Sequence, residues 1–209
     1  MAPPPSSQIA SAPLSDLKPL LLNLLCTKAY KVGDFTLSSG QKSTYYINGK
    51  WVTLDPVGAL LIGRLMLDAL PPGTQGVAGL TLGADPLVSA ISVVSAYEGC
   101  PIPGLIVRKE AKGHGTQAYI EGPPLPVDSL VAVVEDVVTT GQSALKAVDR
   151  LRTAGYQVNH ILTLVDREQG GAQTYGEMGL QFDALFTIRD LQQQWQRLQE
   201  SSGSETNAT

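Results

Sequence analysis

The stretch that decides the fold is SLVAVVEDVVTTGQSAL, residues 129–145. Its first part, residues 129–134, is an almost unbroken apolar run, which is typical of a strand buried on both faces, as in a parallel sheet. Glu135 and Asp136 follow directly, at the carboxyl end of that predicted strand, where open α/β sheets bind their ligands. The residues that lead into a predicted helix over 141–154 offer hydroxyl groups, a glycine and free backbone N–H groups: Thr139, Thr140, Gly141, Gln142 and Ser143.

This string brings together an acidic pair and an anion-binding loop. A helix start favours a phosphate because of its free N–H groups and its dipole, whereas two carboxylates suit hydroxyl groups or a metal ion. A phosphorylated sugar presents both kinds of group. The chain has neither the Gly-Lys-Ser/Thr of a Walker A loop nor, after this strand, the Gly-x-Gly-x-x-Gly of a dinucleotide site.

A purely structural interpretation of the same residues is a solvated strand end followed by a capped helix start. For Glu135 and Asp136 taken alone, we favour that interpretation. For the whole string we favour ligand binding, because the buried strand, the acidic pair and the helix start occur together in the order that such a site needs.

Apolar runs and amphipathic segments alternate along the rest of the chain, which predicts an α/β fold. We expect an open, mostly parallel twisted sheet flanked by helices, with its ligand crevice at the carboxyl ends of the strands. Asp55-Pro56 and Asp85-Pro86 each predict a helix start with Asp as the N-cap. The predicted strands are residues 76–82, 102–107, 129–134, 161–165 and 184–188, and the predicted helices are residues 14–28, 55–70, 85–99, 141–154 and 191–198.

The predicted organisation is a single domain over residues 14–198. Residues 55–198 form its α/β core, and residues 14–54, which do not follow the alternation of strands and helices, form a small N-terminal hood. We expect residues 1–13, rich in Pro, Ser and Ala, to be a flexible arm, and residues 199–209 to be a disordered tail.

Two features predict a soluble protein of the cytoplasm. The N-terminus has no basic residue and no signal-peptide pattern, and the longest aliphatic stretch, residues 20–25, is far too short to span a membrane. Cys26 and Cys100 lie in apolar surroundings and outside any metal-binding spacing, so we expect buried, reduced thiols. We therefore expect no membrane partner.

The charge balance argues against general binding of nucleic acid. The chain has 15 Lys and Arg against 19 Asp and Glu, a formal net charge of −4, whereas such binding depends on many Lys or Arg contacts to phosphates. The position of the cations is more informative. No Lys or Arg lies between Arg64 and Arg108, and then Arg108, Lys109 and Lys112 come together in a glycine-containing loop over residues 109–126. A loop of that length is more often a functional lid than filler.

The string at residues 129–145 resembles the phosphoribosyl-pyrophosphate signature of type I phosphoribosyltransferases. The resemblance implies that Glu135 and Asp136 hold the 2′- and 3′-hydroxyls of the ribose. It also implies that the residues from Thr139 to Ser143 surround the 5′-phosphate. The implied phosphoribosyl-pyrophosphate site consists of Glu135, Asp136, Val137, Val138, Thr139, Thr140, Gly141, Gln142 and Ser143.

Residues 108–115, RKEAKGHG, resemble the flexible catalytic loop of orotate phosphoribosyltransferases. Three fixed cations and a histidine match a leaving pyrophosphate, whose negative charge grows as the glycosidic bond breaks, and the glycines let such a loop open and close. The resemblance implies that the catalytic residues are Arg108, Lys109, Lys112 and His114. The alternative is a solvated basic loop, which we favour for an isolated Lys/Arg run but not for one placed between a buried strand and a phosphate site.

Two further segments, residues 35–48 and 164–170, resemble the base-binding parts of the same family. The resemblance implies that orotate is bound by Tyr46, Ile47, Thr139 and Arg167. An arginine is a planar partner for the orotate carboxylate. The structural alternatives are a strand in which Tyr45 faces inward while Tyr46 meets the base, and a local ion pair of Arg167 with Asp166 or Glu168.

The chain departs from the family pattern at two places. Ser38 stands where a lysine is often found, and residues 81–85, TLGAD, stand where some members have a Tyr-Lys pair. We carry over neither lysine contact.

The resemblance implies the transfer of a phosphoribosyl group to orotate, giving orotidine 5′-phosphate and pyrophosphate, a step of pyrimidine nucleotide synthesis. Mg²⁺ is the implied cofactor, bridging the pyrophosphate and the ribose hydroxyls in the neighbourhood of Asp136 rather than sitting in a protein cage. A homodimer with a shared active site is also implied. The alternatives are a phosphoribosyltransferase for another base, such as a purine or uracil, and a regulatory, RNA-binding protein that keeps the phosphoribosyl site without catalysis.

Overall fold

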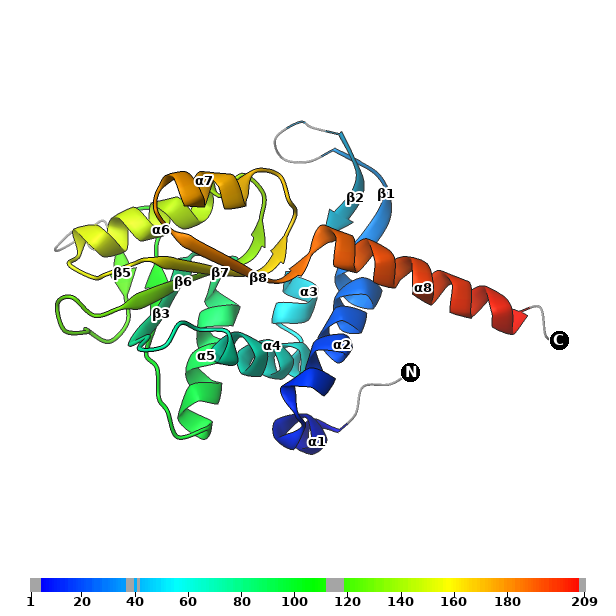
Figure 1. The fold of residues 1–209 in the computed structure, drawn as a ribbon, viewed down its shortest axis with the longest axis horizontal. Helices are drawn as coiled ribbons and strands as arrows, with labels where there is room; N and C mark the ends of the chain where they lie inside the picture. The colour runs from blue at the N-terminus through cyan, green and yellow to red at the C-terminus, as the bar shows by residue number, and fades with distance from the viewer. Residues whose placement is uncertain (1–4, 37–39, 41, 112–118, 207–209) are drawn as a thin grey trace.

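The computed structural model describes residues 5–36, 40, 42–111 and 119–206. Its centre is a six-stranded sheet in the order β5-β4-β3-β6-β7-β8, parallel except for β5, which pairs antiparallel with β4 (Figure 1). This is the open, mostly parallel sheet expected from the sequence. The strands are β3 (Gly76–Leu80), β4 (Gly104–Val107), β5 (Ile120–Glu121), β6 (Val131–Val138), β7 (His160–Asp166) and β8 (Gln181–Thr187).

Helices cover both faces of the sheet and enclose two hydrophobic cores (Figure 1). Along β6, Val133 packs into one core and Val134 into the other. Successive side chains of a strand point to opposite faces, so a strand buried on both faces must be apolar throughout. One core is built on α2 (Leu14–Leu24), α4 (Pro56–Asp68), α5 (Asp85–Tyr97) and α8 (Ile188–Thr206), and the other on α6 (Gln142–Thr153) and α7 (Gly171–Glu177).

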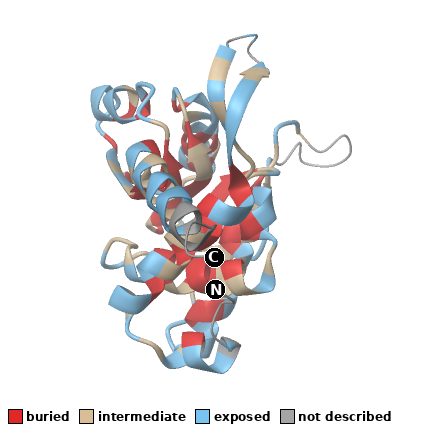
Figure 2. Cartoon of the chain, turned by 90° about the vertical axis from the view of Figure 1, so that its right-hand side faces the viewer, coloured by how far each residue is buried: buried red, intermediate tan, exposed pale blue. Residues whose placement is uncertain are grey.

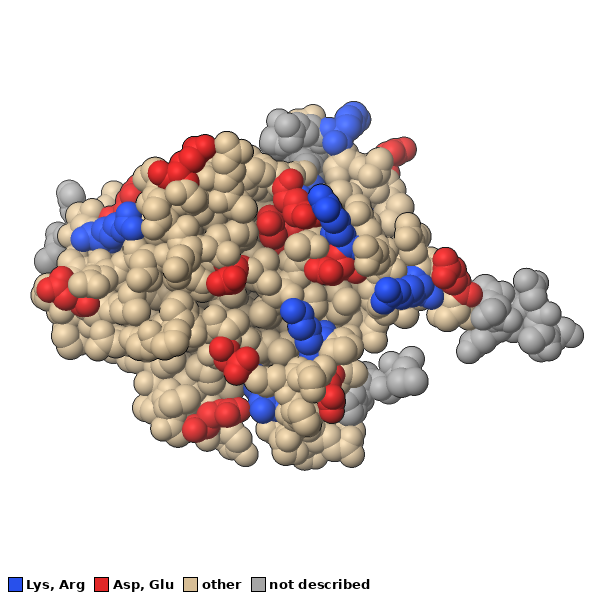
Figure 3. All heavy atoms as spheres, in the orientation of Figure 1, with Lys and Arg blue, Asp and Glu red and all other residues tan. Residues whose placement is uncertain are grey.

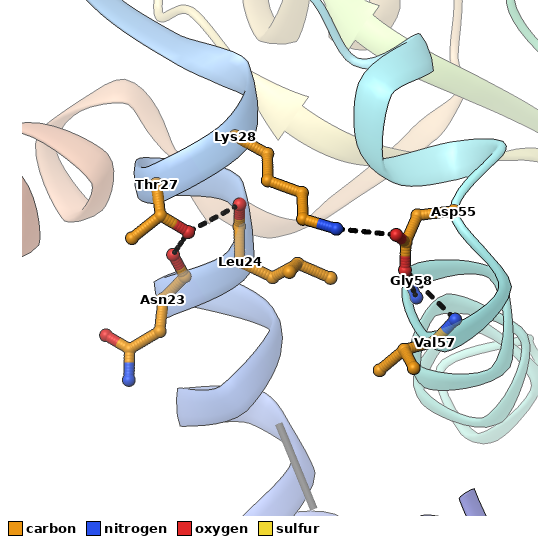
Figure 4. Close-up of polar contacts among 7 residues, drawn as sticks. All are labelled: Asn23, Leu24, Thr27, Lys28, Asp55, Val57 and Gly58. Atoms are coloured by element: carbon orange, nitrogen blue, oxygen red, sulfur yellow. Dashed lines mark hydrogen bonds and ion pairs between the residues drawn. The ribbon is translucent and has the colours of Figure 1, made fainter. Parts of the chain in front are cut away.

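Asp55 starts helix α4 as its N-cap, as predicted. One carboxylate oxygen accepts hydrogen bonds from the N–H groups of Val57 and Gly58, at 3.0 and 2.9 Å. The other accepts from Lys28 Nζ at 2.6 Å, so that the short π-helical turn η1 (Leu25–Ala29) is tied to α4 (Figure 4). Lys28 and these N–H groups hold the pKa of Asp55 below its usual value.

The expectation for Asp85 is wrong in its detail. Helix α5 begins near the predicted position, but Asp85 is its first residue and Ala84 occupies the N-cap position without a side-chain cap. Asp85 Oδ1 is buried and has no hydrogen-bond partner within the described part of the chain. Burial raises the pKa of this carboxyl. The Asp-Pro pattern indicated the helix start, but here Pro86 and the turn after β3 determine it.

The segment that precedes α4 forms a hairpin apart from the main sheet. Strands β1 (Tyr30–Thr36) and β2 (Lys42–Ile47) pair antiparallel, and α3 (Lys50–Thr53) leads from them to α4. The hairpin projects from the body, and its outer part is exposed (Figures 1 and 2). It lies within residues 14–54, for which we expected a hood.

The two ends of the described chain are helical where we expected an arm and a tail. Helix α1 (Ser6–Ser11) packs on α4, with Ile9 only 1% exposed, and Arg64 donates to the carbonyls of Ile9 and Ala12, each at 2.8 Å. Helix α8 continues to Thr206. None of the described helices is long and apolar enough to cross a membrane.

The cysteine prediction holds for one of the two residues. Cys26 is buried, donates to the carbonyl of Leu191 at 3.3 Å, and has its pKa raised to about 12 by burial. Cys100 is exposed, because it follows the end of α5 on a surface turn, where its N–H bonds to the carbonyl of Ser95. Both thiols are free.

Candidate active site

The acidic pair lies inside β6 rather than after it, which corrects the predicted end of this strand at residue 134. Pairing with β7 continues as far as Val138, opposite Asp166. The reason is a polar contact inside the sheet, since Thr163 Oγ1 donates to the carbonyl of Glu135 at 3.0 Å. Both carboxylates are therefore carried by a paired strand, close to its carboxyl end.

Glu135 is a buried carboxyl, only 7% exposed. Its Oε2 atom has no hydrogen-bond partner among the described residues. Burial, and after it the adjacent negative charge of Asp136, raise the pKa of Glu135 to about 8, while the positive charge of Lys109 acts in the opposite direction. A hydroxyl group brought by a ligand can satisfy this oxygen, since buried polar atoms are normally hydrogen-bonded.

Asp136 lies against the turn that follows β3. Its Oδ1 accepts from the N–H of Val137 at 2.9 Å. A Cβ atom added to Gly83 would come within 2.6 Å of Oδ1, so a larger residue here would displace the Asp136 carboxylate. The ends of the neighbouring strands β3 and β6 thus meet at one place, as expected of a ligand crevice in an α/β sheet.

The loop from β6 to α6 forms a small polar pocket. Gly141 is in the left-handed region, with φ of 87°, at the N-cap position of α6. The buried Tyr175 ring of α7 fills the space beneath Gly141, where a Cβ atom would come within 2.7 Å of Cε1. Burial raises the pKa of the Tyr175 hydroxyl. The pocket, of about 60 Å³, is lined by Glu135, Val137, Val138, Thr139, Thr140, Gly141, Gln142, Ser143, Ala144 and Tyr175.

Arg167 follows β7 and reaches the hairpin. Its backbone N–H donates to the carbonyl of Val138 at 2.9 Å, which fixes it beside the polar pocket. Its side-chain Nε donates to the hydroxyl of Tyr45 at 3.2 Å. Asp166 and Glu168, the two carboxylates considered as local ion-pair partners of Arg167, have other partners. Asp166 accepts from the N–H of Glu168, and the Glu168 side chain pairs with Arg189 at 2.9 Å.

The three hairpin residues 45–47 face different ways. Tyr45 and Ile47 pack toward the main core, while the ring of Tyr46 lies on Phe35, at 5.6 Å between centroids, and is 43% exposed. Sequence reasoning assigned Tyr45 a structural role and missed its contact with Arg167. No local signal could reveal it, because 122 residues separate the two.

Two of the four predicted catalytic residues fall within the described part of the chain. Arg108 pairs with Glu121 of β5 at 3.1 Å, and Lys109 is exposed. Lys112 and His114 lie outside the described residues.

Helix α6 holds the backbone of residues 108 and 109, a role that the sequence did not reveal. Arg150 donates hydrogen bonds to the carbonyls of Arg108 and Lys109. The start of the cationic segment is therefore tied to the helix that begins at the polar pocket.

Solved structures define the class of protein to which this fold belongs. An orotate phosphoribosyltransferase from Mycobacterium tuberculosis, in complex with 5-phospho-α-D-ribosyl 1-diphosphate, is 35% identical, with a TM-score of 0.71 over 84% of this chain and 98% of that chain. An adenine phosphoribosyltransferase from Leishmania tarentolae shares the fold at 14% identity, with a TM-score of 0.57, covering 86% of this chain and 89% of that chain. The fold is that of the type I phosphoribosyltransferases.

Sequence relatives narrow the class. No family model matches the chain. An orotate phosphoribosyltransferase from Nostoc sp. is 68% identical over 189 residues, which are 90% of this chain and 92% of the relative. One from Rhodopirellula baltica is 42% identical over 182 residues, 84% of this chain and 93% of the relative. The chain belongs to the orotate phosphoribosyltransferase family.

Proposed function

We propose that the protein transfers the phosphoribosyl group of 5-phospho-α-D-ribose 1-diphosphate to orotate, giving orotidine 5′-phosphate and pyrophosphate in pyrimidine nucleotide synthesis. The observation that carries this proposal is the position of Arg167. Its backbone is bonded to Val138 at the polar pocket, and its side chain reaches Tyr45 of the hairpin. A guanidinium, which suits a carboxylate, thus lies beside a helix start, which suits a phosphate, and this supports the proposal.

One assay tests the proposed reaction. We expect the absorbance of orotate to fall when phosphoribosyl pyrophosphate is added, and we expect this loss to require Mg²⁺. A panel of uracil, adenine and hypoxanthine should give no comparable turnover. Preference for one of these bases would favour a phosphoribosyltransferase of different specificity. Tight RNA binding without pyrophosphate release would favour the regulatory alternative.

The polar pocket supports the assignment of the phosphoribosyl end. Backbone N–H groups at the start of α6 and the hydroxyls of Thr139, Thr140 and Ser143 would hold the 5′-phosphate. Glu135 and Asp136 would bind the ribose hydroxyls, and the partnerless Oε2 of Glu135 suits that role. Burial, and after it the charge of Asp136, raise the pKa of Glu135 to about 8, and a protonated carboxyl can donate a hydrogen bond to a ribose hydroxyl as well as accept one.

The base end is assigned to four residues. Arg167 would pair with the orotate carboxylate and Thr139 would contact the ring. Tyr46 would offer its side chain to the base, and Ile47, whose side chain packs toward the core, would offer its backbone. The orotate ring already carries a negative charge, so its attacking nitrogen needs little help from a general base. Catalysis is then mainly a matter of positioning the base against the anomeric carbon and of stabilising charge.

The leaving pyrophosphate is assigned to the cationic segment. Arg108, Lys109, Lys112 and His114 would neutralise the charge that develops on it as the bond to the anomeric carbon breaks. The positive charge of Lys109 acts to lower the pKa of Glu135. One cation of the segment is therefore close enough to influence the acidic pair, which supports this assignment.

Mg²⁺ fits the acidic end of the site as a partner of the substrate. Within residues 5–36, 40, 42–111 and 119–206, no group of three or more His, Cys, Asp or Glu residues could hold a metal ion. Asp136, a hard oxygen donor at the strand end, would complete a coordination shell made mostly of substrate oxygens and water. The ion, when bound, supplies positive charge to the pyrophosphate.

A homodimer is the proposed assembly. A groove of about 630 Å³ lies between α4 and α5 and is lined largely by apolar side chains. Leu54 and Val93 on its rim are 66% and 70% exposed. Contiguous exposed apolar surface of this kind is typical of a protein interface.

Light scattering tests the assembly. It should give twice the 22.1 kDa chain mass. Leu54→Glu or Val93→Glu should shift the protein toward the monomer, whereas Val127→Glu, at an equally exposed valine elsewhere, should not. A monomeric wild-type protein would contradict the proposal.

Charge and thiol state support a cytoplasmic enzyme of small-molecule substrates. Both cysteines are free thiols, as is usual in a reducing compartment. On the face drawn in Figure 3, Lys and Arg side chains are scattered among Asp and Glu and form no continuous basic surface. Nucleic-acid binding usually requires such a surface.

A further inference from the structure

We propose that Tyr45 is a positioning residue for the base: it holds the Arg167 guanidinium in the orientation that receives the carboxylate of orotate. The inference rests on the proposed function and adds to it a residue outside the predicted site. It is carried by the direct contact of two side chains from separate parts of the fold, β2 of the hairpin and the loop after β7.

The contact with Tyr45 leaves one edge of the guanidinium available. Arg167 Nε donates to the Tyr45 hydroxyl at 3.2 Å, and the guanidinium carbon lies 4.9 Å from the centroid of the same ring. A guanidinium offers five N–H donors in a planar fork. With Nε bonded to Tyr45, the edge formed by Nη1 and Nη2 remains for a two-point contact with a carboxylate.

Tyr45 is itself held rigidly by aromatic neighbours. Its ring stacks on that of Tyr30 of β1, at 5.8 Å between centroids and 29° between planes. Tyr30, which is buried, packs edge-on against Trp195 of α8 at 6.3 Å. A side chain fixed on two elements can impose its orientation on a flexible arginine, whose rotamer freedom is otherwise costly to freeze on binding.

A preoriented Arg167 should affect binding of the base and little else. Without the Tyr45 hydroxyl, the arginine side chain must be ordered when orotate binds, and the lost entropy weakens binding. The KM for orotate should therefore rise, whereas kcat and the KM for phosphoribosyl pyrophosphate should stay close to their wild-type values. A purely structural role of Tyr45 would instead lower thermal stability and disturb all three quantities together.

The first test is Tyr45→Phe, which removes the hydroxyl and keeps the ring. The KM for orotate should rise about tenfold, which corresponds to the upper end of the entropic cost of ordering one flexible side chain on binding. Tyr156→Phe is the matched control, since that tyrosine packs in the core on the other side of the sheet. It should leave the KM for orotate unchanged.

The second test is a double-mutant cycle with Arg167→Lys, which keeps the charge and loses the fork. If Tyr45 acts through Arg167, Tyr45→Phe should raise the KM for orotate less than twofold in the Arg167→Lys background. Multiplying effects, or an unchanged KM in Tyr45→Phe, would overturn the inference while leaving the proposed function intact. A wild-type protein that does not turn over orotate would overturn both.

Discussion

The guanidinium carbon of Arg150 lies 4.1 Å from the centroid of the Tyr119 ring, and the same guanidinium donates to the carbonyls of Arg108 and Lys109. One side chain of α6 therefore fixes the chain on both sides of residues 112–118. Because α6 also begins at the polar pocket, the cationic segment and the loop that we propose for the phosphate share one rigid support.

Arg150→Ala should lower kcat about tenfold, because a small misplacement of catalytic groups carries a cost of this order or more. The melting temperature should change little, since α6 keeps its buried face. Lys146→Ala is the matched control, an exposed cation on the same helix. Steady-state rates at saturating orotate and phosphoribosyl pyrophosphate measure the effect, and equal rates for the two variants would contradict the role of Arg150.

Lys112→Ala should lose turnover on the order of 100-fold or more with the fold intact, as when a group that stabilises transition-state charge is removed. Steady-state kinetics and thermal unfolding together check this outcome. Wild-type rates in the variant would remove Lys112 from the catalytic set.

Asp136→Asn should weaken the binding of phosphoribosyl pyrophosphate and its dependence on Mg²⁺. The amide keeps the shape but loses the charge that suits a hard cation. Calorimetry at several Mg²⁺ concentrations measures both effects. An affinity equal to that of the wild type at every concentration would argue against the acidic pair as the ribose and metal end of the site.

Glu135 should make the ligand-free protein less stable as the pH rises. Burial raises its pKa from 4.5 to about 8 in the folded state, so between these values the folded chain binds a proton that the unfolded chain has lost. The free energy of unfolding contributed by this group therefore falls with pH across that window, by on the order of a few kcal/mol.

Urea unfolding at pH 5 and pH 8 checks this dependence. Glu135→Gln, which carries no ionisable proton, should lose less stability over the same interval. If wild type and variant have parallel pH profiles, Glu135 is ionised in the folded protein throughout.

Features that depend on neighbouring residues along the chain can be predicted from the sequence alone. The apolar run of β6, the loop at residues 139–143 and the cap at Asp55 are local patterns with a direct physical cause, and they occur where predicted. The predicted end of β6 at residue 134 is too early, because the pairing of Glu135 with Thr163 of β7 extends the strand through polar residues. The prediction of Asp85 as an N-cap is wrong, because Ala84 occupies the N-cap position.

Contacts between distant segments could not be predicted in this way. Tyr45 meets Arg167, and Arg150 meets Arg108, only after the sheet has brought their elements together. Periodicity carries no information about such pairs. Short helix α7 was missed for a related reason, since its main anchor, Tyr175, packs beneath Gly141 rather than on a repeating apolar face.

The edge-on contact of Tyr30 with Trp195 means that the two ends of the candidate site are completed at different times during protein synthesis. The segments that build the polar pocket, which are the end of β6, α6, β7 and α7, have all been made once residue 177 is in place, whereas Trp195 is made later. Domains are synthesised from the N-terminus, so the hairpin must wait for α8 before its aromatic stack can close. In a nascent chain, the pocket that we propose for the sugar phosphate can therefore be complete before the hairpin that we propose for the base has its aromatic support.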